Sequence, residues 1–235
     1  MSMYSFKAAC ATYQFLRSQG YPEKATLKLV GDRHRLSRMQ RNCIFRGVIP
    51  DRVAAQRRAK LMETGALQEA GALQGRGLAV DWYNVLITVE SYLRGTTLFL
   101  SDDGVVRDAS ATHGSYRAGT TTERAATELV HQLERWAPSR LEVYLDMPIA
   151  FSGRMAEDLR RRLASAPFVS EVSLAPSADF QLKAFDGVVA SSDSAVLDAC
   201  RRATDLARAV LEERFSFSPP SVHDLFPESR EEPPQ

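Results

Sequence analysis

Cysteine is scarce in this sequence: Cys10, Cys43 and Cys200 are the only three among its 235 residues. They form no CxxC pair and lie far apart, which argues against a disulfide framework or structural zinc site and favours a reducing compartment. No apolar run approaches the about 20 residues that a membrane helix needs, and the N-terminus lacks the basic start and apolar core of a signal peptide. We therefore expect a cytoplasmic protein that contacts no membrane.

The signatures of covalent catalysis are also absent. The sequence has no GxSxG motif and no nucleophilic Cys–His arrangement, and His113 has no obvious acid–base partner. Hydrolysis through a protein nucleophile is therefore not expected. With 44% hydrophobic and 25% charged residues, the composition is that of a globular protein and excludes a disordered or collagenous chain.

Charge is unevenly distributed along the chain, although the net formal charge is only +1. Residues 1–60 hold 13 Lys and Arg against 3 Asp and Glu, whereas residues 61–235 hold 17 against 26. A basic head of this kind is typical of proteins that bind polyanions. The acidic body makes its carboxylates candidates for a functional site.

The apolar pattern predicts a small all-helical domain at 1–62, a glycine-containing linker at 63–77, an α/β domain at 78–214 and a mostly disordered tail at 215–235. In the α/β domain we expect strands at 78–81, 97–100, 141–146, 169–174 and 187–190. Helices are expected near 84–94, 121–136, 153–165 and 194–214. This alternation predicts a mainly parallel sheet with helices on both faces.

Acidic residues stand where a parallel sheet binds its ligands, at the carboxyl ends of the strands. The residues concerned are Asp81, Asp102, Asp103, Asp146 and Asp193, with Asp179 shortly before the last strand. Gathered carboxylates without His or Cys indicate a hard cation, Mg²⁺ or Mn²⁺, which activates water and clamps a phosphoryl group. The competing interpretation is local, because Ser192 or Asp193 would also cap the helix that begins near Ser194.

The basic head contains a segment, 31–46, that predicts an amphipathic helix. Its packed side holds Leu36, Met39, Cys43 and Ile44, and its outer side holds Arg35, Arg38, Asn42 and Arg46. Arginine suits bidentate phosphate contacts and stacking on unpaired bases, although a solvated face is the simpler explanation of a charge run. We expect RNA contacts from Arg33, Arg35, Arg38, Arg41 and Arg46, and from Arg107 and Arg117 in the polar loop 102–117.

Several stretches carry a resemblance to known families: Lys28–Arg33, Arg38–Arg41, Val80–Glu90, Asp102–Asp108 and Ser191–Asp193. Over most of residues 1–215 the chain resembles proteins classed as domain of unknown function 434 at the N-terminus, followed by a second domain of unknown function. More distantly, the body is similar to a PIN or NYN-type nuclease domain. In that domain an Asp-x-x-Asn element, here Asp81 and Asn84, ends the first strand, and a Ser-Asp element, here Ser192 and Asp193, follows a later strand.

The resemblance to PIN domains implies a Rossmann-like fold, bound Mg²⁺ or Mn²⁺ and cleavage of RNA. It implies catalytic roles for Asp81, Asn84, Asp146 and Asp193, with the metal held by the three aspartates. The fourth acid stays open among Glu123, Glu128, Asp103, Asp108 and Asp179.

We therefore predict a metal-dependent ribonuclease that acts on RNA positioned by the basic head. One alternative is a non-catalytic RNA-binding or adaptor protein, and another is a small-molecule phosphohydrolase that uses the same acids. The sequence leaves the RNA and the oligomeric state open, a homo-oligomer included.

Overall fold

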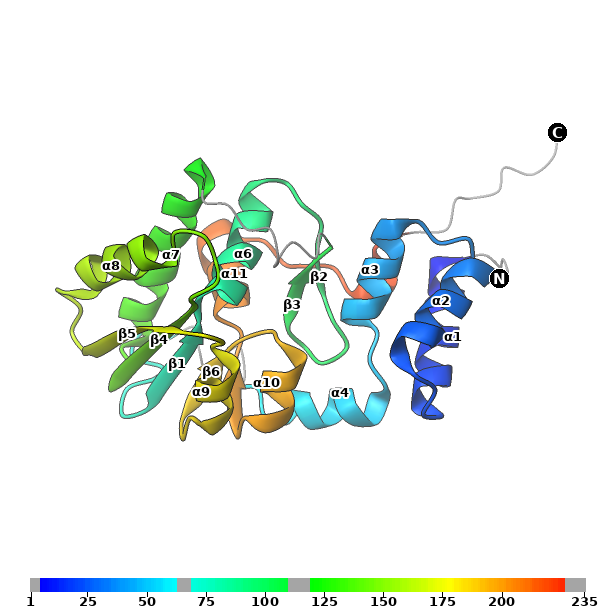
Figure 1. Ribbon diagram of the computed structural model, residues 1–235, viewed down its shortest axis with the longest axis horizontal. Helices are drawn as coiled ribbons and strands as arrows, with labels where there is room; N and C mark the ends of the chain where they lie inside the picture. The colour runs from blue at the N-terminus through cyan, green and yellow to red at the C-terminus, as the bar shows by residue number, and fades with distance from the viewer. Residues whose placement is uncertain (1–4, 63–68, 110–118, 227–235) are drawn as a thin grey trace. The chain divides into compact units, whose positions relative to one another are not determined.

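The computed structural model describes residues 5–62, 69–109 and 119–226 (Figure 1). The chain forms two compact units. The first unit comprises Met1–Gln56, Leu98–Ala111 and Pro219–Gln235, and the second comprises Arg57–Thr97 and Thr112–Ser218. Both units are therefore assembled from segments that are separated in the sequence.

Four helices lie within the described residues 5–62, in agreement with the helical N-terminal region that the sequence predicts. They are α1 (Phe6–Ser18), α2 (Glu23–Arg33), α3 (Arg38–Gly47) and α4 (Asp51–Arg58). Side chains fix two of the starts: Ser5 Oγ accepts a hydrogen bond from the Ala8 N–H, and Ser37 and Gln40 form a reciprocal capping box. The apolar faces of α1, α2 and α3 then share one core, which includes Phe6, Tyr13, Val30 and Ile44.

The prediction of one continuous helix over 31–46 is wrong. The chain leaves α2 at Arg33 and passes through Arg35, whose φ of 52° lies in the left-handed region, before α3 begins. The break rotates the second half of the segment relative to the first. Leu36, Cys43 and Ile44 are buried as expected, but Met39 is 47% exposed.

A two-stranded antiparallel sheet, β2 (Leu98–Leu100) with β3 (Val106–Asp108), belongs to the first unit. The expectation that 97–100 joins the parallel sheet is therefore wrong. Phe99 is fully buried in the core of the first unit. A Cβ atom on Gly47 would lie 2.6 Å from the Phe99 ring. Only glycine lets α3 approach β2 this closely.

The segment after Phe215 is ordered further than expected. A 3₁₀ turn, η2 (Val222–Asp224), follows it, and the Leu100 N–H donates to the Pro220 carbonyl at 2.8 Å. Val222 is fully buried in the core of the first unit. The expectation of disorder therefore does not hold for residues 215–226, and residues 227–235 lie outside the described part of the chain.

The second unit is built on a five-stranded parallel sheet of order β5-β4-β1-β6-β7. Its strands are β1 (Gly77–Asp81), β4 (Arg140–Asp146), β5 (Val169–Ala175), β6 (Val188–Ala190) and β7 (Arg202–Thr204). The predicted α/β class and mainly parallel sheet are confirmed. The predicted helix over 194–214 is interrupted, because β7 separates α10 (Ser194–Ala199) from α11 (Leu206–Phe215), whose start is capped by Asp205.

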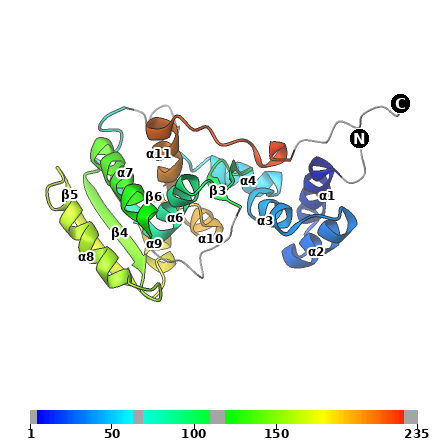
Figure 2. The ribbon, with the colours of Figure 1, turned by 90° about the horizontal axis from the view of Figure 1, so that it is seen from above.

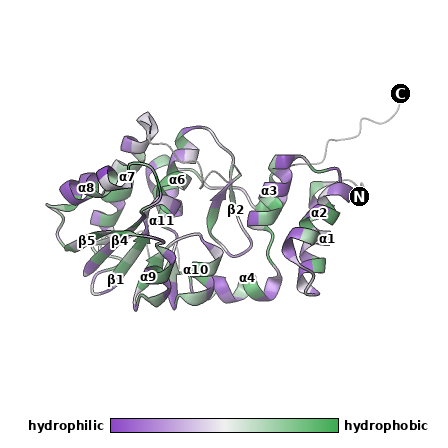
Figure 3. Ribbon diagram, viewed as in Figure 1, coloured by the Kyte–Doolittle hydropathy of each residue, from purple (hydrophilic) through white to green (hydrophobic). Residues whose placement is uncertain are grey.

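Helices α6 (Trp82–Leu93), α7 (Thr120–Trp136), α8 (Ser152–Leu163) and α11 share one large apolar core with the sheet (Figure 2). Alternate strand residues such as Leu78 and Val80 point into this core. The short α9 (Asp179–Ala184) packs against β1, and α10 packs against α9. Hydrophobic colour follows the strands in Figure 3, whereas α8 is largely hydrophilic. None of the helices in the described ranges has the length and apolar character needed to cross a membrane.

Candidate functional site

An acidic cavity lies at the carboxyl ends of the parallel strands in the second unit. Asp81 ends β1, Asp146 ends β4, and Asp193 follows β6 at the start of α10. Asn84 reaches the same cavity from the first turn of α6. The cavity has a volume of about 150 Å³ and is lined by these four residues together with Tyr83, Ile149 and Asp179. The structure thus brings the four predicted catalytic residues together.

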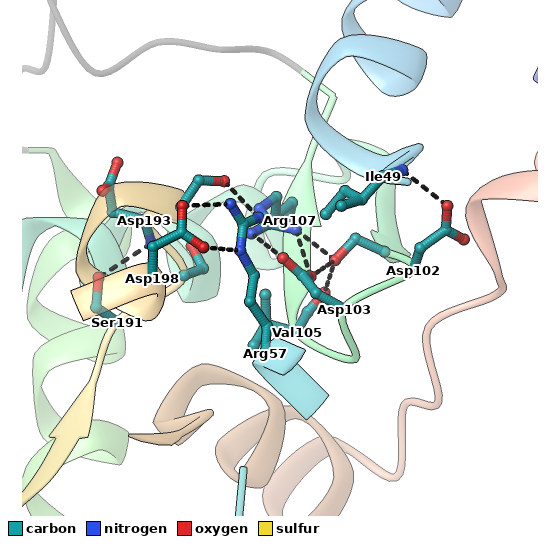
Figure 4. A network of polar contacts seen from close by, with 12 residues as sticks. Ile49, Arg57, Asp102, Asp103, Val105, Arg107, Ser191, Asp193 and Asp198 are labelled. Atoms are coloured by element: carbon teal, nitrogen blue, oxygen red, sulfur yellow. Dashed lines mark hydrogen bonds and ion pairs between the residues drawn. The ribbon is translucent and has the colours of Figure 1, made fainter. Parts of the chain in front are cut away.

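Asp81 is the most buried carboxylate of the cavity, with 6% of its surface exposed. The Ser191 hydroxyl donates to Asp81 Oδ2 at 2.9 Å. Figure 4 shows the next link, in which the Asp193 N–H donates to Ser191 Oγ at 3.0 Å. This chain of hydrogen bonds anchors the Asp81 side chain to the turn after β6.

Asn84 joins the turn after β6 to the first turn of α6. Its Oδ1 accepts hydrogen bonds from the Ser192 N–H at 2.8 Å and the Ser192 hydroxyl at 2.9 Å. The Asn84 side chain thereby fixes the turn that carries Asp193. The Asp-x-x-Asn and Ser-Asp elements, which are 108 residues apart, are thus in direct contact through their Asn and Ser.

The local interpretation of Asp193 is also correct. Its Oδ1 accepts from the N–H groups of Ala195 at 2.8 Å and Val196 at 3.1 Å, so Asp193 caps α10. In the same way, Asp146 Oδ1 accepts from the Ala178 N–H at 3.0 Å. Each carboxylate is held through one oxygen, which leaves Oδ2 without a hydrogen-bond donor among the described residues. Capping and ligand binding are therefore compatible.

The electrostatics of the cavity disfavour the ionised form of Asp81. Burial raises the pKa of its carboxyl group to about 7, and the negative charges of Asp146 and Asp193 add to this, whereas the Ser191 hydrogen bond opposes it. Burial and the Asp146 charge likewise raise the pKa of Tyr83 to about 12, so that its phenol stays protonated at neutral pH. Such perturbation by burial and like charges is characteristic of functional sites.

The donor set fits a hard divalent cation, because carboxylate and amide oxygens are the ligands that Mg²⁺ and Mn²⁺ prefer. With the side chains as they stand, no group of three or more His, Cys, Asp or Glu within residues 5–62, 69–109 and 119–226 could hold one ion. After side-chain adjustment, Asp81, Asp146 and Asp193 would hold the cation through their carboxylate oxygens.

Among the acids left open for the fourth position, Asp179 is the one that lines the cavity. Asp103 and Asp108 lie in the first unit, where they pair with Arg107 at 2.7 Å and Arg46 at 2.8 Å. Glu123 and Glu128 of α7 pair with Arg162 and Arg214, respectively. Tyr83 and Ile149 were not singled out by the sequence, although Tyr83 lies inside the Asp-x-x-Asn element.

The predicted RNA-binding arginines fall into two classes. Arg33, Arg35 and Arg38 are exposed around the turn between α2 and α3. The other described arginines form internal contacts: Arg41 with Asp32 at 2.9 Å, Arg46 with Asp108, and Arg107, which is 3% exposed, with Asp103 (Figure 4). These three stabilise the fold of the first unit and do not form an exposed basic surface. Arg117 lies outside the described residues.

Comparisons with known proteins match two stretches of the chain to families. The family described as "Domain of unknown function (DUF5616)" matches residues 70–209, and the family described as "Protein of unknown function (DUF434)" matches residues 5–60. The predicted resemblance to the second of these is confirmed. An uncharacterized protein of Methanocaldococcus jannaschii is 26% identical over 193 residues, which are 82% of this chain and 89% of that protein. No solved structure matches the chain.

Proposed function

Since the chain belongs to the family described as "Domain of unknown function (DUF5616)", we propose its activity from the chemistry of the acidic cavity: it is a PIN-like hydrolase that uses Mg²⁺ or Mn²⁺ to cleave phosphodiester bonds of RNA. The observation that carries the proposal is the convergence of Asp81, Asn84, Asp146 and Asp193 on one cavity at the carboxyl ends of β1, β4 and β6. That is the position where parallel α/β sheets bind their ligands.

In this proposal the residues of the acidic cavity have different roles. Asp146 and Asp193 would supply the negative charge that attracts a divalent cation, and Asp81 would join them as a ligand in its deprotonated form. The bound cation supplies Lewis-acid chemistry, since it neutralises phosphate charge and lowers the pKa of water. Asn84 and Ser192 keep the turn after β6 in place, so that Asp193 stays directed toward the cavity.

Exposed Arg33, Arg35 and Arg38 would bind RNA phosphates in this proposal. One observation favours the non-catalytic alternative. In their present conformations, no three acidic side chains of the described residues are close enough together to hold one metal ion. In that case the chain would bind RNA without cutting it.

The test is RNA cleavage by the full chain, measured on labelled single-stranded RNA over a range of Mn²⁺ concentrations. Asp81→Asn should abolish Mn²⁺-dependent cleavage, because loss of an anionic ligand weakens a hard-cation site strongly. Asp186→Asn is the matched control, since Asp186 lies outside the acidic cavity and pairs with Arg201 at the surface. Cleavage that survives both Asp81→Asn and EDTA would refute the mechanism.

A further inference from the structure

A second cavity, of about 400 Å³, lies in the same unit as the acidic cavity and shares one lining residue, Tyr83, with it. The start of α7 contributes Thr122 and Glu123, and the start of α8 contributes Phe151 and Arg154. Figures 1 and 2 label the two helices. A cavity of this size lies within the range of small-molecule sites.

Phe151 places an exposed aromatic ring at this cavity, and its backbone conformation is unfavourable for the stability of the folded protein. The residue is 67% exposed, and its φ of 64° lies in the left-handed region, which is unfavourable for a bulky side chain. It stands at the N-cap of α8 but makes no side-chain capping hydrogen bond. An exposed apolar ring held in a strained conformation contributes little to stability, and such strain is concentrated at functional sites.

Arg154 provides a cation next to this ring. Its guanidinium carbon lies 5.2 Å from the centroid of the Phe151 ring, and no carboxylate of the described residues pairs with it. The other arginines of α8 are engaged: Arg160 donates to the Val172 carbonyl, and Arg161 and Arg162 pair with Asp158. Arg154 is therefore the arginine of α8 that is free of ion pairs and hydrogen bonds to the described residues.

We propose that this cavity binds the nucleobase of the nucleotide whose phosphate lies at the acidic cavity. The base would stack on Phe151 with the Arg154 guanidinium beside it, as bases do on aromatic and arginine planes. Glu123 and Asp158 also line the cavity, and Arg162 pairs with both, so their oxygens accept hydrogen bonds from base amino groups without a large excess of negative charge. This inference rests on the proposed function, because it assigns a substrate class to the same site.

The test compares two phosphate ligands that differ in the base. Binding of 5′-AMP and ribose 5-phosphate to the full chain is measured by calorimetry in the presence of Mg²⁺. The wild type should bind 5′-AMP about 5- to 150-fold more tightly, the range that base–aromatic stacking provides. Phe151→Ala should remove this preference, and Phe151→Trp should keep it.

Two further variants control for folding and for the mere loss of an exposed ring. Phe151→Gly removes the ring and also relieves the positive φ, so it should melt no earlier than the wild type while losing the preference. Phe15→Ala deletes a phenyl group that is 62% exposed in the first unit and should leave both affinities unchanged.

The proposal is overturned if the wild type binds 5′-AMP no better than ribose 5-phosphate, or if Phe151→Ala and Phe151→Gly retain the preference. The outcomes separate it from the proposed activity. A chain that binds 5′-AMP through Phe151 but cuts no RNA upholds the base site and refutes the nuclease. Cleavage that depends on Asp81 but not on Phe151, without a preference for 5′-AMP, overturns the base site alone.

Discussion

Replacement of Asp81 should stabilise the folded protein while it removes the proposed activity. Burial and the neighbouring Asp146 and Asp193 raise the pKa of Asp81 from an ordinary value of 3.8 to about 7. Because the folded state binds this proton more tightly than the unfolded state does, folding is most favoured below pH 3.8, and that advantage is lost as the pH rises through 7. The rise in pKa corresponds to about 4 kcal/mol of lost stability above pH 7.

Asparagine at position 81 removes the titration, and its side-chain oxygen still accepts a hydrogen bond from Ser191. The stability gained by Asp81→Asn should therefore grow from about 1 kcal/mol at pH 4.5 to about 4 kcal/mol at pH 8.5. At 2 to 4 °C per kcal/mol, the melting temperature of the variant should exceed that of the wild type by up to about 16 °C at the higher pH.

Thermal denaturation of both proteins between pH 4.5 and 8.5, with and without Mn²⁺, provides the assay. At pH 8.5 Mn²⁺ should raise the melting temperature of the wild type more than that of Asp81→Asn, because a bound cation offsets the repulsion among the carboxylates. Asp186→Asn, at a side chain that is 85% exposed, should melt like the wild type at every pH. A difference between Asp81→Asn and the wild type that does not change with pH would refute the reasoning.

Two further predictions concern the first unit. The hydrogen bond and charge of Asp102 raise the pKa of His223. The stability that this contact contributes is present below the unfolded pKa of His223 and is lost as the pH rises through its folded pKa. In denaturant titrations, His223→Gln should therefore lower the free energy of unfolding more at pH 5.5 than at pH 8.5. Replacement of Arg33, Arg35 and Arg38 by Gln should reduce the salt slope of log RNA affinity by about 2 without changing the melting temperature, as fluorescence titration at several salt concentrations will show.

The sequence identified the acidic cavity because its signal is local. Asp81 and Asp146 each end an apolar run that reads as a buried strand, and parallel strands bring such ends to one edge. The fourth acid, Asp179, could not be chosen in advance, since its position depends on a six-residue helix with no clear periodicity. The burial of Asp81, which raises its pKa, depends on tertiary packing, and the spacing of residues in the sequence does not predict it.

The sequence was less informative about the head. A run of arginines looks uniform, but Arg46 is paired with Asp108, 62 residues away, and such a partner is invisible in local spacing. Phe99 and Val222 lie outside the N-terminal segment and still complete its core. Strands of three residues such as β2 and β7 are too short for an alternating pattern to show which sheet they join.

The late position of Val222 in the chain imposes an order on folding during synthesis. The core of the first unit contains Phe6, the first residue of α1, and Val222, the last of its buried members to leave the ribosome. Every strand of the parallel sheet, by contrast, has been translated by Thr204. The core of the N-terminal helices therefore stays incomplete, with Phe99 and Gly47 uncovered on the side that Val222 fills, until residue 222 has been synthesised. The N-terminal helices thus gain their complete core only after all five strands of the parallel sheet have been translated, and a nascent chain stopped before the 3₁₀ turn exposes the apolar surface that Val222 covers.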